Sequence, residues 1–306
     1  MAADGGRAVG IQDFQMLIGK TEMSVSGRFL KVARLRHEWF EYLDDPGAFV
    51  AEARRAGGAD ILTFLQEAHL KRPALAFPSE PAGASVLTFK SFDDWWKNLN
   101  PKARNKARKA QKCGVELRLV PPDDDFVRGV EAIYNESPLR QGRKFTHYGK
   151  SFETIKEDLR SFPECTFFVG AYHENRLIGF MKLFEGSQIL RTVHILATFA
   201  DRDKCVMDAL IAKAVEIASA KHISHLHYGD WAHQGLGAFR LKFGFERHDC
   251  PRYFVPLNWR GELALKAGLH RPLRERIPQA WKDRMVSARN QWNAWRHGAR
   301  PVAAED

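Results

Sequence analysis

GAFRLKFGF, residues 237–245, is the most informative stretch of this 306-residue chain. Its apolar residues are interrupted by Arg240 and Lys242, which predicts a short helix with one buried face and one solvated face. Gly244 follows where the end of a helix needs a residue that tolerates positive φ. The strand-like HLHYGDW, residues 225–231, comes before this helix and further strand formers come after it. An ordinary helix of an α/β protein is the simpler interpretation.

The bulk composition predicts a folded cytoplasmic protein. Hydrophobic residues make up 44% of the chain and charged residues 27%, as is usual for globular proteins. The four cysteines lie far apart without a CxxC pair, which favours reduced thiols over disulfides or zinc. No apolar run reaches the roughly 20 residues of a membrane span, and the N-terminus has no signal-peptide pattern.

The net charge of +10 is concentrated in two segments. Residues 97–118 contain eight Lys/Arg and one acid, and residues 258–306 contain ten Lys/Arg and five acids. Clustered positive charge attracts polyphosphates, nucleic acid or an anionic membrane. A merely solvated basic surface is the alternative.

Patterning divides the chain into four segments. We expect a flexible leader over residues 1–27, an α/β half over 28–120, a second half over 121–257 after Pro121-Pro122, and a basic helical tail over 258–306. In the first half, residues 46–55 predict a helix opened by Asp45. A basic helix over 101–112 has only a thin alanine face, so we expect it to present cations to a partner.

The second half shows regular alternation of helices and strands. The pattern predicts helices over 126–136, 151–162 and 203–221, strands over 166–173, 176–186, 189–198 and 225–231, and a polar loop over 135–150.

The tail carries a narrow apolar stripe on a basic helix. Apolar residues recur at spacings of 4, 4, 3, 4 and 3 at Ile277, Trp281, Met285, Ala288, Trp292 and Trp295. Three interpretations remain open. The stripe packs on its own protein, forms a homodimer seam, or lies on a membrane surface.

Three motifs give the chain a resemblance to a known family. NPKARNKARKAQKCGVELR at the junction of the halves, RLIGFMKLF on the predicted hairpin, and GAFRLKFGF resemble the Gcn5-related N-acetyltransferase (GNAT) fold. They are most similar to its subgroup of Fem-type peptidoglycan aminoacyl transferases, which contain two such folds in tandem. The resemblance implies a mixed, mainly antiparallel sheet flanked by helices, with residues 28–120 as a degenerate first copy.

The resemblance also implies a binding mode for the acyl donor. Two central strands, here 189–198 and 225–231, splay apart to receive pantetheine, and backbone N–H groups at the start of the next helix hold the pyrophosphate. Arg202, Lys204, Phe239 and Lys242 are the implied cofactor-binding residues. The family's phosphate loop is rich in glycine, whereas residues 199–204 read FADRDK. The donor is therefore either acyl-CoA, such as acetyl-CoA, or an aminoacyl-tRNA whose phosphates the basic helix would bind.

Acyl transfer to an amine needs a neutral acceptor nitrogen, a polarised carbonyl and a protonated leaving group. His194 lies mid-strand and is a candidate proton relay, although such a histidine is often structural. Tyr228 and Asp230 share a face at the end of the next strand, where Asp230 would orient or deprotonate the amine. The alternative is that Tyr228 and Asp230 have only a structural role and complete the hydrogen bonds at the end of the strand.

The polar loop is the candidate site for the acceptor. Arg side chains clamp carboxylates and phosphates well, and the loop gathers five polar or aromatic residues. These are Arg140, Gln141, Arg143, His147 and Tyr148.

The histidines at 225 and 227 share a strand face but lack a supporting carboxylate or cysteine, so we expect no metal site. The preferred hypothesis is an N-acyltransferase that moves an acyl or aminoacyl group to a small-molecule or peptide amine. The alternative is a non-catalytic GNAT-like protein that binds RNA or a protein through its basic helix and tail.

Overall fold

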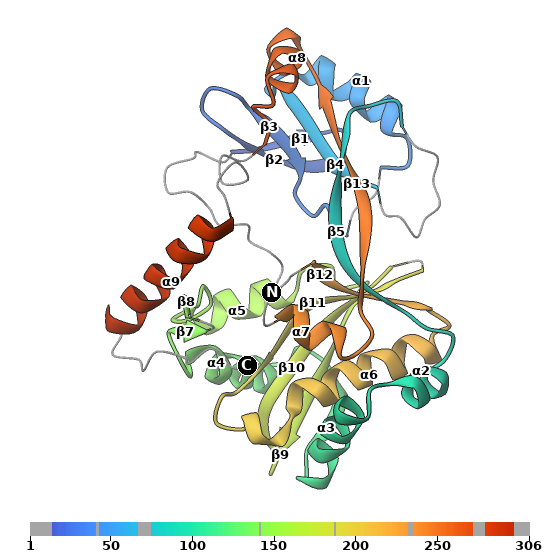
Figure 1. The fold of residues 1–306 in the computed structure, drawn as a ribbon, viewed down its shortest axis with the longest axis vertical. Helices are drawn as coiled ribbons and strands as arrows, with labels where there is room; N and C mark the ends of the chain where they lie inside the picture. Colours follow the sequence, from blue (N-terminus) through green and yellow to red (C-terminus); the bar gives the residue numbers. More distant parts are fainter. Residues whose placement is uncertain are drawn as a thin grey trace. The chain divides into compact units, whose positions relative to one another are not determined.

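The computed structural model describes residues 14–40, 43–66, 75–140, 142–186, 188–231, 236–271 and 279–296. It is an α/β fold in which helices accompany a mainly antiparallel sheet (Figure 1). The fold class predicted from the sequence is confirmed.

The chain forms two compact units whose segments interleave. Unit 1 contains Thr88–Leu226 and Leu273–Asp306, and unit 2 contains Ala2–Leu87 and His227–Pro272. This division differs from the sequential halves expected from the sequence. Strand β13 (Glu246–Pro256) is the physical reason, because it pairs antiparallel with β4 (Ile61–Leu65) near the other end of the chain.

Unit 2 is a sheet with hydrogen-bonded strand order β1-β2-β3-β4-β13-β5. Its remaining elements are β1 (Phe14–Ile18), β2 (Thr21–Ser26), β3 (Val32–Leu35), β5 (Ser79–Thr88), α1 (Pro46–Ala56), α7 (Leu236–Leu241) and α8 (Trp259–Lys266). Helix α1 begins as predicted, with the Asp45 carboxylate accepting the Ala48 N–H at 2.9 Å.

The first two strands differ from the flexible leader expected over residues 1–27. β1 and β2 form an antiparallel hairpin that joins β3. Met23 and Val25 lie two residues apart, so both side chains point into the core of unit 2, where they are fully buried. Residues 1–13 lie outside the described part of the chain.

Unit 1 contains the predicted antiparallel strands, in the order β12-β11-β10-β9-β6. They are β6 (Glu116–Val120), β9 (Thr166–His173), β10 (Arg176–Glu185), β11 (Leu190–Ala197) and β12 (His225–Asp230), the last of which begins in unit 1 and ends in unit 2.

The helices of unit 1 are α2 (Phe92–Asn98), α3 (Pro101–Lys112), α4 (Asp124–Asn135), α5 (Phe152–Leu159), α6 (Val206–Ala220) and α9 (Gln279–Arg296). Both α4 and α6 pack directly on the sheet. Phe180 on β10 packs in the cluster formed by α4 and α5, whereas its neighbour Gly179 faces Val206 of α6. Since successive residues of a strand point to opposite faces, α4 and α6 lie on opposite faces of β10.

The basic helix forms as predicted. α3 packs against α6 and buries Ala103, Ala107 and Ala110. Its cationic side chains at Lys102, Lys106, Arg108, Lys109 and Lys112 are exposed. The small alanine face explains how so polar a helix docks and still presents its charge to solvent.

The stretch 237–245 is a helix with a glycine stop, and Phe243 and Phe245 are buried as predicted, but the predicted faces of Arg240 and Leu241 are exchanged. Gly244 has φ 87°, as its place after α7 requires. Arg240 is buried and Leu241 is 56% exposed. The Arg240 guanidinium donates to Ser85 Oγ at 2.9 Å and to the Asp230 carbonyl, and lies 4.5 Å from the centre of the Tyr228 ring.

Arg240 therefore ties α7 to two strands of unit 2, and its removal should destabilise that unit. We expect Arg240→Ala to lower the free energy of unfolding by about 2–3 kcal/mol, because two buried acceptors lose their donor. Urea denaturation measures this loss. Arg247→Ala, which removes an exposed arginine paired with Asp249, should change stability by less than about 1 kcal/mol. Equal losses for the two variants would contradict this role.

Candidate functional site

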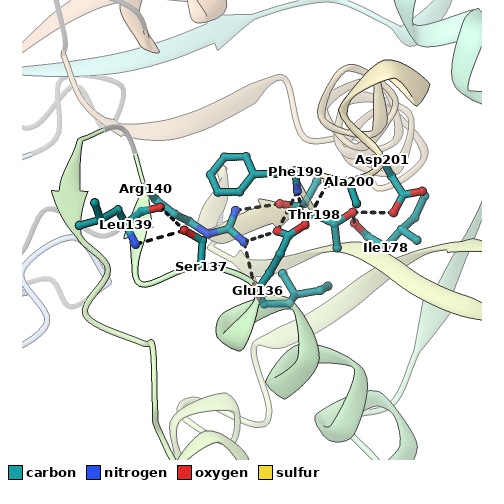
Figure 2. Close-up of polar contacts among 11 residues, drawn as sticks. Glu136, Ser137, Leu139, Arg140, Ile178, Thr198, Phe199, Ala200 and Asp201 are labelled. Atoms are coloured by element: carbon teal, nitrogen blue, oxygen red, sulfur yellow. Dashed lines mark hydrogen bonds and ion pairs between the residues drawn. The ribbon is translucent and has the colours of Figure 1, made fainter. Parts of the chain in front are cut away.

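The candidate site of unit 1 lies where β11 ends and the chain turns toward α6. Here the backbone N–H groups of Phe199 and Ala200 point at one carboxylate, that of Glu136 (Figure 2). The Phe199 nitrogen lies 2.7 and 2.8 Å from the two carboxylate oxygens, and the Ala200 nitrogen lies 2.9 Å from Oε1. Two adjacent N–H groups aimed at one point form an anion cradle.

Arg140 holds the same carboxylate from the other side. Its Nη2 donates to Glu136 Oε2 at 3.1 Å and to the Ile133 carbonyl at 2.9 Å, and its Nη1 donates to the Ala197 carbonyl at 2.8 Å. The guanidinium also lies 4.5 Å from the centre of the Phe199 ring. Burial lowers the pKa of Arg140, an effect that the Glu136 charge opposes. Arg140 therefore binds a carboxylate, and that carboxylate belongs to its own chain.

A second carboxylate braces the turn. Asp201 is buried and accepts hydrogen bonds from Thr198 Oγ1 at 2.8 Å and Arg176 Nη2 at 2.9 Å. Lys204 Nζ lies 3.0 Å from its other oxygen. Burial opposes ionisation of Asp201, but these three donors together lower its pKa to about 2. Lys204, predicted to bind phosphate, is thus engaged with Asp201, while Arg202 is exposed in the same turn.

His194 lies in a buried cluster of aromatic and imidazole rings in unit 1. Its Nδ1 is 3.0 Å from the Tyr134 hydroxyl on α4, and its ring centre is 5.0 Å from that of His147. Burial lowers the pKa of His194 well below its usual value. Burial, with added repulsion from Lys150, lowers the pKa of His147 to about 4. Both imidazoles are neutral at pH 7, and His194 Nε2 has no hydrogen-bond partner among the described residues.

Lys182 on β10 is the register partner of His194 and is also buried. Its ammonium donates to the Leu159 carbonyl at 2.9 Å and to the carbonyl and hydroxyl of Ser161 at 3.0 and 2.7 Å. Burial lowers its pKa to about 8. With all three donor positions used, Lys182 fixes α5 to the sheet beside the histidine.

The remaining predicted catalytic residues belong to unit 2. Tyr228 is 4% exposed, and burial raises its pKa to about 12. Loss of hydration and repulsion from Glu38 raise the pKa of Asp230. In the same unit, Lys242 Nζ lies 4.4 Å from the centre of the Phe239 ring. The predicted candidates thus divide between the units, with His194 in unit 1 and these four residues in unit 2.

The loop predicted to bind the acceptor contains a short hairpin, β7 (Leu139–Arg140) with β8 (Arg143–Lys144). Arg140 and His147 are half-buried, whereas Arg143 and Tyr148 are exposed. Gln141 lies outside the described residues. Part of the predicted loop is thus a hairpin, and Leu139 and Phe145 are buried at its base.

Sequence reasoning missed Glu136 and Tyr134. One signal was available for Glu136, which lies at the C-terminal end of α4. An acidic side chain is unfavourable there, since the helix dipole leaves negative charge at that end. A carboxylate in that place indicates a cationic or N–H partner elsewhere in the fold.

The described residues contain no cluster of three or more metal-ligating side chains. No described helix has the length and apolarity that crossing a bilayer requires.

Comparison with known proteins supports the fold. No family model and no curated protein matches the sequence. Among solved structures, FemX is similar, with TM-score 0.56 and 11% identity over 80% of this chain and 89% of that one. The C-terminal domain of a putative lysylphosphatidylglycerol synthetase from Agrobacterium fabrum has TM-score 0.54 and 14% identity over 83% and 87%. L-PGS from Bacillus licheniformis has TM-score 0.51 and 12% identity over 81% and 84%. The GNAT-like fold inferred from the sequence is confirmed.

The neutral imidazole of His147 makes unit 1 sensitive to acid. Its pKa is about 4 when folded and near 6.5 when unfolded, so the unfolded chain binds more protons between these values. We expect stability to fall as pH drops from 6.5 to 4, with roughly 1–2 kcal/mol from this half-exposed ring. Denaturation of wild type and His147→Gln at pH 7 and 4.5 measures the difference, which the variant should reduce.

His248→Gln provides the matched control, because His248 is half-buried in unit 2. It should retain the wild-type dependence on pH. If His147→Gln retains it too, another group is responsible for the acid sensitivity.

Proposed function

We propose that this chain, with its GNAT-like fold, is an N-acyltransferase that moves an aminoacyl group from aminoacyl-tRNA to an amine. Acyl-CoA is the competing donor. The single observation that supports this choice is the Glu136 carboxylate on the N–H groups of Phe199 and Ala200. In the fold that the chain resembles, these N–H groups follow the strand at which the donor's pyrophosphate would bind.

A pyrophosphate at this position would have to displace Glu136. The displaced carboxylate would lose three short contacts to backbone N–H groups, and Arg140 would lose its anionic partner while half-buried. Hydrogen bonds to charged groups contribute about 1.5–3 kcal/mol each. This cost disfavours CoA as the acyl donor. It favours a donor whose phosphates bind to another part of the protein.

The reaction requires few groups from the protein. The neutral amine attacks the carbonyl carbon of the aminoacyl ester, a C–N bond forms, and the C–O bond to the tRNA breaks. The amine proton passes to the leaving oxygen. His194, neutral at pH 7 and with Nε2 unpaired among the described residues, is the proposed proton relay in unit 1.

The basic helix α3 is the proposed contact for the donor. Its exposed lysines form no ion pair within the described part of the chain, and its buried face consists only of alanine. Sequence-independent binding of nucleic acid depends mainly on such phosphate contacts. These phosphate contacts do not require exposed aromatic side chains.

The direct test uses labelled aminoacyl-tRNA and labelled acetyl-CoA with a panel of amines. We expect transfer from the tRNA and little from acetyl-CoA. The burial of Tyr228 and His194 favours one rival, a protein that keeps the fold only for binding. Tight tRNA binding without transfer to any amine would support that rival and contradict the proposed activity.

Glu136→Gln tests whether the carboxylate excludes CoA. The substitution keeps the size of the side chain but removes its charge, so the neutral carboxamide binds the two N–H groups more weakly and a phosphate displaces it more easily. We expect CoA affinity, measured by calorimetry, to increase about tenfold or more, corresponding to about 1.4 kcal/mol. Glu131→Gln on the same helix removes equal charge away from the cradle and should leave affinity unchanged. Tight CoA binding by the wild type that the substitution weakens would contradict this role for Glu136.

The double variant Lys106→Glu/Lys109→Glu tests the donor contact. Reversing two exposed charges on α3 should weaken tRNA binding by about tenfold at moderate salt and reduce the dependence of affinity on salt. Filter binding at several salt concentrations measures both. Unchanged affinity and unchanged salt dependence would exclude α3 from the donor site.

A further inference from the structure

Helix α9 presents an apolar face that is exposed in the described part of the chain. We name Trp281, Met285, Ala288, Trp292 and Trp295 the tryptophan face. Trp281 is 63% exposed, Trp292 57% and Trp295 74%. Among the described residues the tryptophan face is therefore left exposed, contrary to one interpretation of the sequence. Ile277, at the start of the predicted stripe, lies outside the described residues.

The opposite side of α9 is the one that contacts the protein. Asn293 donates to the carbonyl of Gly142 at 3.2 Å, and Asn290 lies against the same glycine. A side chain at Gly142 would come within 2.8 Å of Asn290, so the glycine permits this close approach. Both asparagines are half-buried, unlike the tryptophan face. The helix is thus docked by its amide side and directs its tryptophans to solvent.

The charges on α9 flank the tryptophan face. At 3.6 residues per turn, the tryptophan face occupies an arc of about 80°. Arg284 lies beside one edge of this arc, and Arg289 and Arg296 lie beside the other. All three arginines are exposed, and none forms an ion pair with a described side chain.

Arg143 adds to this positive surface. It lies on β8, which contacts α9, and its charge repels that of Arg289. Burial and this repulsion both lower the pKa of Arg289. Two neighbouring arginines without an acidic partner among the described residues leave positive charge that an external anion would neutralise.

We propose that α9 binds the surface of an anionic membrane, with its tryptophan face in the headgroup region and its flanking arginines on lipid phosphates. Tryptophan prefers this interface because its ring is apolar and its N–H is polar. An apolar face bordered by arginines is the typical pattern of helices that lie in the plane of a bilayer. Such helices bury their apolar face about 5–10 Å deep.

The same surface fits a second copy of the chain less well. In a two-fold symmetric pair each patch meets itself, so the arginines of both copies would face one another. The tryptophan face has no acidic member to offset them. An anionic lipid surface supplies the opposite charge along the whole helix.

Vesicle flotation of the full chain tests the proposal. We expect binding to phosphatidylcholine vesicles that contain phosphatidylglycerol and much weaker binding to phosphatidylcholine alone. Trp292→Ala/Trp295→Ala and Arg284→Glu/Arg289→Glu should each lower the partition coefficient at least tenfold. The arginine variant alone should also abolish the preference for phosphatidylglycerol.

Lys106→Glu/Lys109→Glu on α3 is the matched control, because it changes the net charge of the chain by the same amount. It should retain vesicle binding. An equal loss in this control would mean that net charge alone attracts the protein, and would overturn the proposal. Absence of binding to vesicles that contain phosphatidylglycerol would also overturn it.

Two further outcomes would reject the membrane in favour of another occupant. Sedimentation equilibrium that shows a dimer abolished by Trp292→Ala/Trp295→Ala, together with no vesicle binding, would assign the surface to a second copy. Loss of tRNA binding in the same variant without loss of vesicle binding would assign it to nucleic acid. Neither measurement depends on the proposed acyl transfer, since vesicle binding requires no donor or acceptor.

Discussion

The contact between Glu136 and the N–H groups after β11 organises unit 1. One carboxylate connects the end of α4, the end of β11 and the base of the β7–β8 hairpin through Arg140 (Figure 2). The contact stabilises both elements. It neutralises the Glu136 carboxylate, which is unfavourable at the C-terminal end of a helix, and it gives the N–H groups of the turn an acceptor that they would otherwise lack. The polar loop and the turn after β11 are thus held by the same carboxylate.

The second polar centre of unit 1 has the opposite character. Around Glu136 the groups are ionised and paired, whereas His194, His147 and Tyr134 are held uncharged by burial. Proton transfer needs a neutral base, and an anion site needs fixed donors. Unit 1 therefore holds a neutral imidazole on β11 and a carboxylate bound by backbone N–H groups at the end of the same strand.

The fold was predictable because it depends on local periodicity. The spacing of apolar residues in 203–221 and the strands on either side of the Glu174-Asn175 turn required no tertiary information. The site was less predictable. The Glu136 carboxylate accepts from the N–H of Phe199, which lies 63 positions away, and no local sequence pattern predicts that contact. Arg240 was expected in solvent, but Tyr228 and the Asp230 carbonyl draw it inward and turn Leu241 outward. Local alternation cannot reveal such a buried partner.

The interleaving of the two units sets an order of folding. Unit 1 has its strands β9, β10 and β11 within one short, continuous stretch, so its central pairs close small loops. Unit 2, by contrast, is held by contacts between residues that lie far apart in the sequence. Arg252 binds Glu38 across 214 positions, and the Tyr253 hydroxyl bonds to the Leu75 N–H across 178. During synthesis from the N-terminus, β1–β4 and α1 supply most of the core of unit 2 before β13 leaves the ribosome. Over that interval the edge of β4 that pairs with β13 stays open, and an open strand edge is a site at which chains aggregate.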